Sequence, residues 1–286
     1  MDTELTIIKA SGERCPFSPD KLLRSLHRAG ADHEQARSIL DEVSSRLYEG
    51  ITTKAIYRIA FSMLKEGSRH LAARYHLKQA IMELGPSGFP FERYVGELLK
   101  FKGYNIRIGK ILQGKCVTHE IDVIADKDNE HLLIECKYHN YAGVSCDVKV
   151  PLYIHSRYLD VTAGVEQQRH SSKINQGWVV TNTRFTDDAL TYAACAGLVA
   201  VGWDYPAKNG LKDQIDRSGL YPITCLTSLT GAEKQKLLER EIVLCKDLED
   251  NEKLLKAIGI KSSRNIVVLQ EVRELCKYIE RGTTTR

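Results

Sequence analysis

Two carboxylates and a lysine stand close together near the middle of the chain. Asp122 lies in the segment His119–Ala125, whose alternate residues are apolar, and Glu135 and Lys137 lie in the apolar segment Leu132–Tyr138. Because side chains two residues apart on a strand leave the same face of a sheet, we expect Glu135 and Lys137 to point to one side. If the two segments form a hairpin, Asp122 lies beside Glu135.

Two converging carboxylates form a site of hard oxygen ligands, which suits Mg²⁺. A lysine beside them can orient or deprotonate a water molecule, or stabilise the charge on a phosphate. Together these groups predict metal-assisted hydrolysis of a phosphodiester bond. The alternative is an ordinary salt bridge on an edge strand, since most charged side chains are solvated. A lysine within an apolar strand is costly if it is buried without partners, which favours the functional interpretation.

The elements around these residues predict an α/β domain with a mixed sheet over about residues 89–205. The expected elements are helix 91–101, strands 105–112, 119–125 and 131–138, helix 147–170, strand 177–181, helix 186–196 and strand 198–203. We expect Cys136 to point to the face opposite Glu135 and Lys137, as a small core residue. The neighbouring histidines are given no catalytic role; they are His119, His139 and His155.

This segment resembles the PD-(D/E)XK nuclease superfamily, and within it the Mrr-like restriction endonucleases. The matching motifs run in order over about 115 residues. They are Phe91-Glu92, Leu98-Leu99, Gly103-Tyr104, Glu120-Ile121-Asp122-Val123-Ile124, Ile134-Glu135-Cys136-Lys137, Gly177-Trp178-Val179-Val180-Thr181-Asn182, and Phe185-Thr186 with Ala189. A lone D…ExK pattern is weak, whereas the ordered set is specific.

The resemblance implies that Asp122 and Glu135 bind Mg²⁺ or Mn²⁺ and that Lys137 completes the active site. A glutamate of the first helix often joins them in this superfamily, and Glu92 and Glu97 are the two candidates here. Glu92 flanks the apolar stripe of that helix at about 90° from its centre, whereas Glu97 points further toward solvent, so we favour Glu92. Glu120 shares the strand face of Asp122, and its position fits a supporting role and a plain outward-facing residue equally well.

Residues 1–88 resemble the ATP-cone domain. The motifs that carry the resemblance are Ile7-Ile8-Lys9-Ala10-Ser11-Gly12, Phe17-Ser18-Pro19-Asp20-Lys21-Leu22, Gly50-Ile51-Thr52-Thr53-Lys54-Ala55-Ile56 and Ala72-Ala73-Arg74-Tyr75. The resemblance implies that Lys9 and Lys21 contact the phosphates of ATP or dATP and that Thr53 adds a polar contact. The family has Lys-Arg at the first motif, where this chain has Lys9-Ala10, so a degenerate helical spacer is the alternative.

Residues 222–286 contain short helices that resemble a helix-hairpin-helix module. The hairpin is the apolar-Gly-apolar sequence Ile258-Gly259-Ile260, where glycine permits a tight turn. The following helix can offer its first backbone amides to a DNA phosphate, and Lys256, Lys261 and Arg264 surround the turn. Such a grip holds the DNA backbone without reading its sequence. The alternative is a small helical bundle used for dimerisation.

The chain therefore divides into residues 1–88, 89–205, a linker at 206–221, and 222–286. The expected fold class is multidomain α/β: a helical ATP-cone, a restriction-endonuclease-like α/β core with a mixed sheet, and a small all-α C-terminal domain.

The net charge of +4 over 286 residues is too small to name a partner. No apolar run approaches the roughly 18 residues that cross a bilayer. The eight cysteines have no C-x-x-C spacing, which favours reduced thiols over a zinc site. The N-terminus has no signal-peptide pattern, so we expect a cytoplasmic protein without a membrane partner.

We therefore expect an endonuclease that uses Mg²⁺ or Mn²⁺ to hydrolyse DNA and is regulated by ATP or dATP. The sequence has no G-x-x-x-x-G-K-[ST] loop, so the nucleotide is expected as an effector and not as a fuel. One alternative is a nucleotide-responsive DNA-binding regulator whose nuclease fold is unused, and another is a junction-resolving or repair nuclease. A homodimer or higher homo-oligomer would bring two active sites to the two DNA strands.

Overall fold

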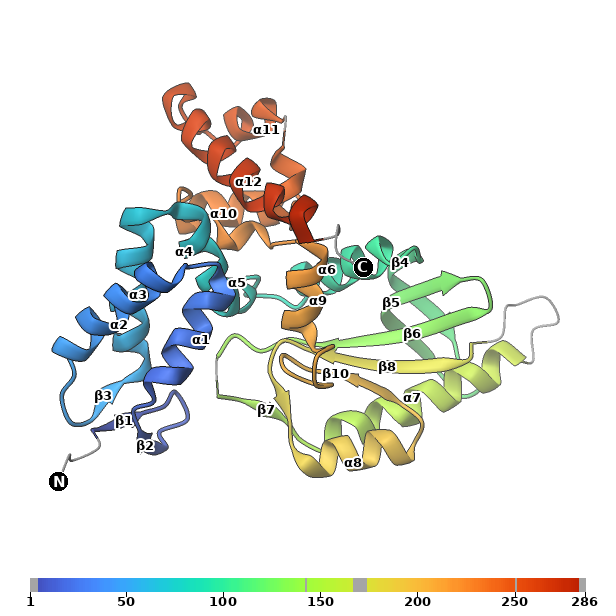
Figure 1. Ribbon diagram of the computed structural model, residues 1–286. Coiled ribbons are helices and arrows are strands. Elements are labelled where there is room, and N and C mark those ends of the chain that lie inside the picture. Colours follow the sequence, from blue (N-terminus) through green and yellow to red (C-terminus); the bar gives the residue numbers. More distant parts are fainter. Residues whose placement is uncertain (1–4, 142, 167–173, 250, 283–286) are drawn as a thin grey trace. The chain divides into compact units, whose positions relative to one another are not determined.

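The computed structural model describes residues 5–141, 143–166, 174–249 and 251–282 of the chain (Figure 1). The chain divides into two compact units, of which the first joins Met1–Ile81 to Tyr221–Arg286 and the second is Met82–Leu220. The N-terminal and C-terminal parts, separate in the sequence, thus belong to one unit. The expected fold class is confirmed: a multidomain α/β protein with a mixed-sheet core and helical N-terminal and C-terminal parts.

The N-terminal part is a layer of helices beside a small sheet. β1 (Thr6–Ile8) pairs antiparallel with β2 (Arg14–Pro16) and parallel with β3 (Ile51–Thr52). The helices are α1 (Pro19–Ala29), α2 (His33–Ser45), α3 (Thr53–Gly67), α4 (Arg69–Tyr75) and α5 (Leu77–Met82). A turn at His76, whose ring hydrogen-bonds the hydroxyl of Tyr57 at 2.5 Å, separates α4 from α5.

Capping side chains begin the first helices of this part. The Ser18 hydroxyl accepts the backbone N–H of Lys21 at the start of α1, and the Asp32 carboxylate accepts that of Gln35 at the start of α2. Each contact satisfies a backbone donor that has no partner within the helix. The helices then bury an apolar face, whose fully buried members include Leu26, Ala36, Val43, Ala60 and Ala72. Helix packing in this part therefore follows from the apolar spacing that the sequence displays.

The C-terminal part consists of short helices and one long helix. They are η1 (Ile223–Cys225), α10 (Gly231–Leu238), η2 (Cys245–Leu248), α11 (Glu252–Ala257) and α12 (Ser262–Gly282). α11 and α12 are joined by the expected turn, in which Gly259 has a φ of +93°. The Gly259 N–H donates to the Lys256 carbonyl at 3.0 Å, and the Ile260 N–H donates to the Leu255 carbonyl at 3.0 Å. These bonds close the end of α11 in the manner of a glycine C-cap.

Within the first unit, α4 and α12 pack against each other. The His70 ring lies 3.4 Å from the carboxylate of Glu274, and the Thr224 hydroxyl donates to the Ala80 carbonyl at 2.6 Å. The two sequence regions therefore share a polar contact of partly exposed side chains and a buried hydrogen bond, in keeping with their place in one unit.

The second unit is built on a five-stranded sheet with the order β10-β8-β6-β5-β4. The strands are β4 (Asn105–Gln113), β5 (Thr118–Lys127), β6 (Glu130–Lys137), β8 (Gln176–Thr181) and β10 (Val199–Val201). β4, β5 and β6 form an antiparallel meander, and β6, β8 and β10 run parallel, so the predicted mixed sheet is confirmed. A short parallel pair, β7 (Ser145–Cys146) with β9 (Arg184–Phe185), lies outside this sheet.

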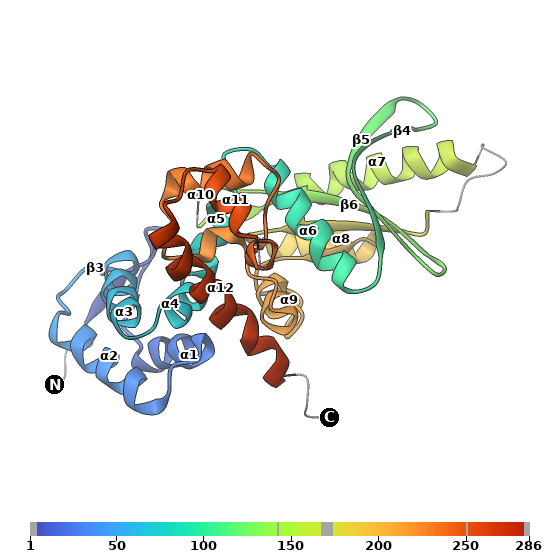
Figure 2. The same ribbon diagram turned by 90° about the horizontal axis from the view of Figure 1, so that it is seen from above.

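Helices cover both faces of this sheet (Figure 2). α7 (Lys149–Glu166) and α8 (Asp187–Cys195) pack on one face, and α6 (Phe89–Phe101) packs against β4, β5 and β6 on the other. The segment 206–221, expected as a linker, contains α9 (Leu211–Ser218). α9 is folded because Leu211 and Ile215 are buried and because Lys102 of α6 donates to Gln214 at 2.7 Å.

Among the described residues, no helix has the length and apolar character needed to span a bilayer.

Candidate active site

Asp122 and Glu135 lie where β5 and β6 separate. The last pair of the antiparallel ladder is Val123 with Ile134, so Asp122 and Glu135 occupy the first positions beyond it. One oxygen of the Asp122 carboxylate accepts the backbone N–H of Cys136 at 2.7 Å, across the opening between the strands. The predicted hairpin is therefore confirmed, and it places the two carboxylates side by side at its open end.

The neighbouring strand β4 is also interrupted at this point. The β4–β5 ladder pairs Ile108 with Val123 and Lys110 with Ile121, and it skips Gly109, which lies opposite Asp122. Gly109 has a φ of +59°, and a Cβ built on it would lie 4.0 Å from a carboxylate oxygen of Glu120. Glycine thus permits an irregular backbone beside the acidic residues without filling the space there.

Glu92 of α6 joins the two strand carboxylates. Burial, and after it the charges of Asp122 and Glu120, raise the pKa of Glu92 to about 7. The pKa of Glu135 is also raised to about 7, first by burial and then by Asp122. Burial likewise raises the pKa of Asp122. We call Glu92, Asp122 and Glu135 the carboxylate cluster; its members are close enough to disfavour one another's charge.

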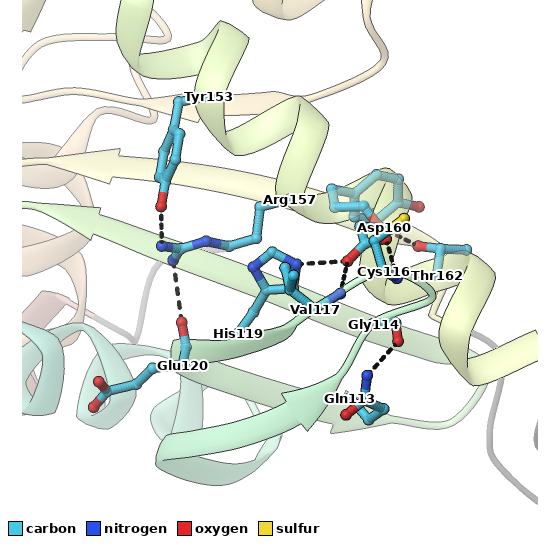
Figure 3. A network of polar contacts seen from close by, with 11 residues as sticks. Gln113, Gly114, Cys116, Val117, His119, Glu120, Tyr153, Arg157, Asp160 and Thr162 are labelled. Carbon is cyan, nitrogen blue, oxygen red and sulfur yellow. Dashed lines mark hydrogen bonds and ion pairs between the residues drawn. The ribbon is translucent and has the colours of Figure 1, made fainter.

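Glu92 and Glu97, the two candidates from the sequence for the third carboxylate, have different surroundings in the structure. Glu97 lies one turn further along α6 and forms an ion pair with Lys100 at 3.5 Å, away from the carboxylate cluster. The Glu120 carboxylate points away from the guanidinium of Arg157 (Figure 3) and raises the pKa of Glu92. The geometry therefore favours Glu92 over Glu97 as the third carboxylate, with Glu120 at the margin of the cluster.

Lys137 follows Glu135 on the same face of β6. Its side chain is exposed, and its backbone carbonyl accepts the hydroxyl of Thr181 on β8 at 2.7 Å. Cys136, between the two, has a thiol whose pKa burial raises well above its ordinary value, so it stays a neutral thiol. The Lys137 side chain is thus open to solvent, and its charge favours the ionised form of Asp122, so its ammonium lies near the carboxylate cluster.

The cation that actually contacts Glu135 is Arg157, which the sequence argument missed. The Arg157 guanidinium forms an ion pair with the Glu135 carboxylate. It also donates to the Glu120 carbonyl at 3.1 Å and to the Tyr153 hydroxyl at 2.8 Å, as Figure 3 shows. Arg157 and Tyr153 lie one turn apart on α7, in the helix expected at 147–170. That spacing was the only available signal, and it does not reveal which strand the helix faces.

The donor set of the carboxylate cluster fits a divalent cation. In the part of the chain that the structure describes, no three His, Cys, Asp or Glu side chains already converge tightly enough to enclose a metal ion. Mg²⁺, however, is usually held by one or two carboxylates and completes its shell with water. Asp122 and Glu135 each commit one oxygen to a protein partner. Burial, and after it the charges of neighbouring carboxylates, raise the pKa of both groups, and a cation would favour their ionised forms. These two carboxylates are therefore the residues that would hold it.

A second polar network secures the β4–β5 turn next to α7 (Figure 3). The Asp160 carboxylate accepts the backbone N–H groups of Cys116 at 2.8 Å and Val117 at 3.3 Å, and it pairs with the His119 ring at 2.8 Å. His119 therefore has a structural contact. His155 likewise bonds Tyr192, at 2.9 Å.

The three residues expected to bind nucleotide line one pocket of the N-terminal part. Lys9, Lys21 and Thr53 surround a cavity of about 220 Å³. Its wall includes Tyr57 and Tyr75, whose rings are stacked with centroids 5.4 Å apart and an angle of 4° between their planes. Tyr57 was not predicted from the sequence to line this pocket. Cationic and aromatic side chains in one cavity suit a ligand that carries both phosphate and a flat ring.

The C-terminal residues expected to hold DNA fall into two groups. Lys256 and Lys261 are exposed on either side of Gly259. Arg264 is instead bound to the Glu233 carboxylate, at 2.5 and 3.0 Å, and to the Ser228 carbonyl at 2.7 Å. This contact lowers the pKa of Glu233 to about 2. Arg264 therefore ties α12 to α10, while the two lysines remain available to a ligand.

Comparisons with known proteins define the class of each part. A restriction endonuclease model matches residues 85–202, an ATP cone domain model matches residues 5–80, and an AF1548-like C-terminal model matches residues 221–276. The chain thus carries a nuclease domain of the Mrr-like restriction endonuclease type and an ATP-cone domain. Both expected resemblances are confirmed. The third model describes the C-terminal part by its own family and not as a helix-hairpin-helix.

The chain belongs to the AF1548-like family, whose relatives match about two thirds of its length. An uncharacterized protein of Archaeoglobus fulgidus is 35% identical over 182 residues, which make up 63% of this chain and 99% of that protein. The crystal structure of AF1548, a protein of unknown function, is 33% identical and matches 67% of this chain and 100% of its own, with a TM-score of 0.56. A structure of Can2 from Sulfobacillus thermosulfidooxidans in complex with cyclic tetra-adenylate is 16% identical, with 69% of this chain and 54% of that chain covered. Its TM-score is 0.32.

The Asp160 network predicts a pH-dependent contribution to stability. The hydrogen bond from His119 and those from the backbone amides hold the pKa of Asp160 below its usual range. A carboxyl with a lowered pKa stabilises the folded state above its unfolded-state pKa, and this stabilisation is lost as the pH falls. We expect Asp160→Asn to unfold at lower urea than the wild type at pH 7, and the difference to shrink below about pH 4.

The control is Asp41→Asn, an exposed aspartate of α2 that lies beyond the first turn of the helix. Urea unfolding of this variant should match the wild type at both pH values. A deficit of Asp160→Asn that stays constant down to pH 3 would contradict the assigned role of the Asp160 charge.

Proposed function

We propose that this protein is an endonuclease that uses Mg²⁺ or Mn²⁺ to hydrolyse phosphodiester bonds of DNA, under the control of ATP or dATP. The observation that carries the proposal is the carboxylate cluster at the open end of the β5–β6 hairpin, with Lys137 beside it, in a domain of the restriction endonuclease class.

The residues of this site have different roles in the proposed reaction. Asp122 and Glu135 hold the cation, which when bound supplies Lewis-acid stabilisation of the phosphate and a lower pKa for a nearby water. The Lys137 ammonium is exposed and orients the attacking water or stabilises negative charge on the phosphate. The charge of Asp122 helps to raise the pKa of Glu92, so the two carboxyl groups lie near each other, and we assign to Glu92 the acceptance of a proton from that water.

The first test is cleavage of supercoiled plasmid and of branched DNA with Mg²⁺ or Mn²⁺. Because their side chains act directly on the cation and the water, Asp122→Ala and Lys137→Ala should lower the rate by a factor on the order of 100 or more. Glu92→Gln should also lower it, whereas Glu97→Gln, the matched change one turn away on α6, should cleave as the wild type does.

If the wild type cleaves no faster than Asp122→Ala and Lys137→Ala, the enzymatic proposal fails and a DNA-binding regulator with an unused nuclease fold remains. Faster cleavage of branched than of linear duplex DNA would instead identify a junction-resolving or repair nuclease.

Nucleotide control is proposed from the N-terminal pocket. Lys9 and Lys21 are the cations of the pocket, and Lys9 forms an ion pair with Glu13 at 2.9 Å that a phosphate would replace. The rings of Tyr57 and Tyr75 offer an apolar wall for the base. The ATP cone class of this part supports ATP or dATP as the effector.

Calorimetry with ATP and with dATP tests this part of the proposal. Each of Lys9→Ala and Lys21→Ala should weaken binding about tenfold or more, since a hydrogen bond to a charged group contributes roughly 1.5–3 kcal/mol. Lys54→Ala, an exposed lysine of α3 that does not line the pocket, serves as the control and should bind as the wild type does. No heat with either nucleotide would leave the N-terminal part a structural spacer.

DNA contact is proposed for the turn between α11 and α12. Lys256 and Lys261 flank Gly259 and are exposed, so both ammonium groups can reach one DNA backbone. Contacts of this kind hold phosphates and release counterions, which makes binding weaker as salt rises.

Binding of a duplex should therefore be measured over a series of salt concentrations, in an Asp122→Ala background that prevents cleavage. The double change of Lys256 and Lys261 to Gln should weaken binding and reduce the slope of log affinity against log salt by about 2. The same change at Lys54 and Lys65, exposed lysines of the same unit, should leave the slope unaltered. An unchanged slope in the first variant would favour the dimerisation alternative for this part.

A further inference from the structure

Glu135 is expected to bind the metal, yet in the structure it is already bound to a cation of the chain itself. The Glu135 and Arg157 side chains are only 20% and 16% exposed, and their ion pair lies within the proposed active site. A pair at this depth is screened less by water and salt than a surface pair is, so it influences any other charge that approaches Glu135.

Arg157 is held in place from two further directions. Its guanidinium donates to the Glu120 carbonyl on β5 and to the Tyr153 hydroxyl on α7. The guanidinium carbon also lies 4.9 Å from the centre of the Tyr153 ring, a distance typical of a cation–π contact. These contacts join β5, β6 and α7 at the guanidinium of Arg157. The ion pair with Glu135 is therefore held in position by the surrounding fold.

The charges around the carboxylate cluster indicate how Arg157 affects the binding of a metal ion. The carboxylate cluster holds three acidic groups, and the cations that act on it are Arg157, bound to Glu135, and the exposed Lys137. Arg157 is thus the cation in direct contact with the cluster. A divalent ion that binds Glu135 has to replace the guanidinium or share the carboxylate with it, and in both cases the positive charge of Arg157 opposes its entry.

We propose that Arg157 is a positioning residue that holds Glu135 before a metal ion binds and, by competing for the same carboxylate, sets the affinity of the active site for divalent cations. This inference rests on the proposed function, because it takes Glu135 to be a metal ligand. It assigns to Tyr153 the secondary task of holding the guanidinium on Glu135.

The test is the affinity of the full chain for Mn²⁺, measured by calorimetry without DNA. Arg157→Gln should bind Mn²⁺ about tenfold more tightly than the wild type, because a competing unit charge has been removed. Arg157→Lys keeps the charge and should bind as the wild type does. Arg184→Gln removes an arginine from an ion pair with Asp204 elsewhere in the same unit and should have no effect.

A damaged fold lowers metal affinity, so the expected increase cannot arise from misfolding. Tyr153→Phe provides a second variant should Arg157→Gln not fold; loss of the hydroxyl that holds the guanidinium should tighten Mn²⁺ binding by about threefold. Mn²⁺ binding of Arg157→Gln, or of Tyr153→Phe in its place, that equals or falls below that of the wild type would overturn the inference.

The same variants separate this inference from the proposed function. If the wild type cleaves DNA in a manner that depends on Asp122 while Arg157→Gln gains no affinity, the inference alone fails. If neither the wild type nor Arg157→Gln binds Mn²⁺ and no cleavage occurs, the metal site and the inference fail together.

Discussion

Repulsion among Glu92, Asp122 and Glu135 is the constraint around which the second unit is arranged. Acidic groups that lie close together in a partly buried place raise one another's pKa, and such a cluster persists only if the surrounding fold stabilises it. Here the fold supplies a backbone N–H for Asp122 and a guanidinium for Glu135. Three features of the fold contribute to this: the end of the β5–β6 ladder, the irregular backbone of β4 beside the acidic residues, and the position of α7, which carries Arg157.

Much of this site could be predicted because it depends on local periodicity. The two-residue period of a strand placed Glu135 and Lys137 on one face, and the helical period of α6 favoured Glu92 over Glu97. The strands and helices of the second unit follow the expected order for the same reason. Periodicity does not report where a ladder ends, so the separation of β5 from β6 at Asp122 appeared only in the structure.

Arg157 could not be predicted because its role depends on packing between distant segments. Nothing in the sequence of α7 indicates that residue 157 faces Glu135, which lies 22 residues earlier in the chain. The same limit applies to α9, whose polar sequence suggested a linker although Leu211 and Ile215 are buried. It applies most clearly to the first unit, where segments more than 100 residues apart share hydrogen bonds such as that between Thr224 and Ala80.

Within the first unit, the proposed nucleotide pocket and the C-terminal part are joined through α4. α4 contributes Tyr75 to the proposed nucleotide pocket and His70 to the contact with Glu274 of α12. One short helix thus touches both the pocket and the C-terminal part. The role of Glu135 as a metal ligand in the second unit can be measured through the dependence of plasmid nicking on Mg²⁺ concentration. We expect the wild-type rate to rise with Mg²⁺ and to saturate, and we expect Glu135→Gln to require far more Mg²⁺ or not to cleave. Nicking that is independent of Mg²⁺, or the same Mg²⁺ dependence in both proteins, would contradict it.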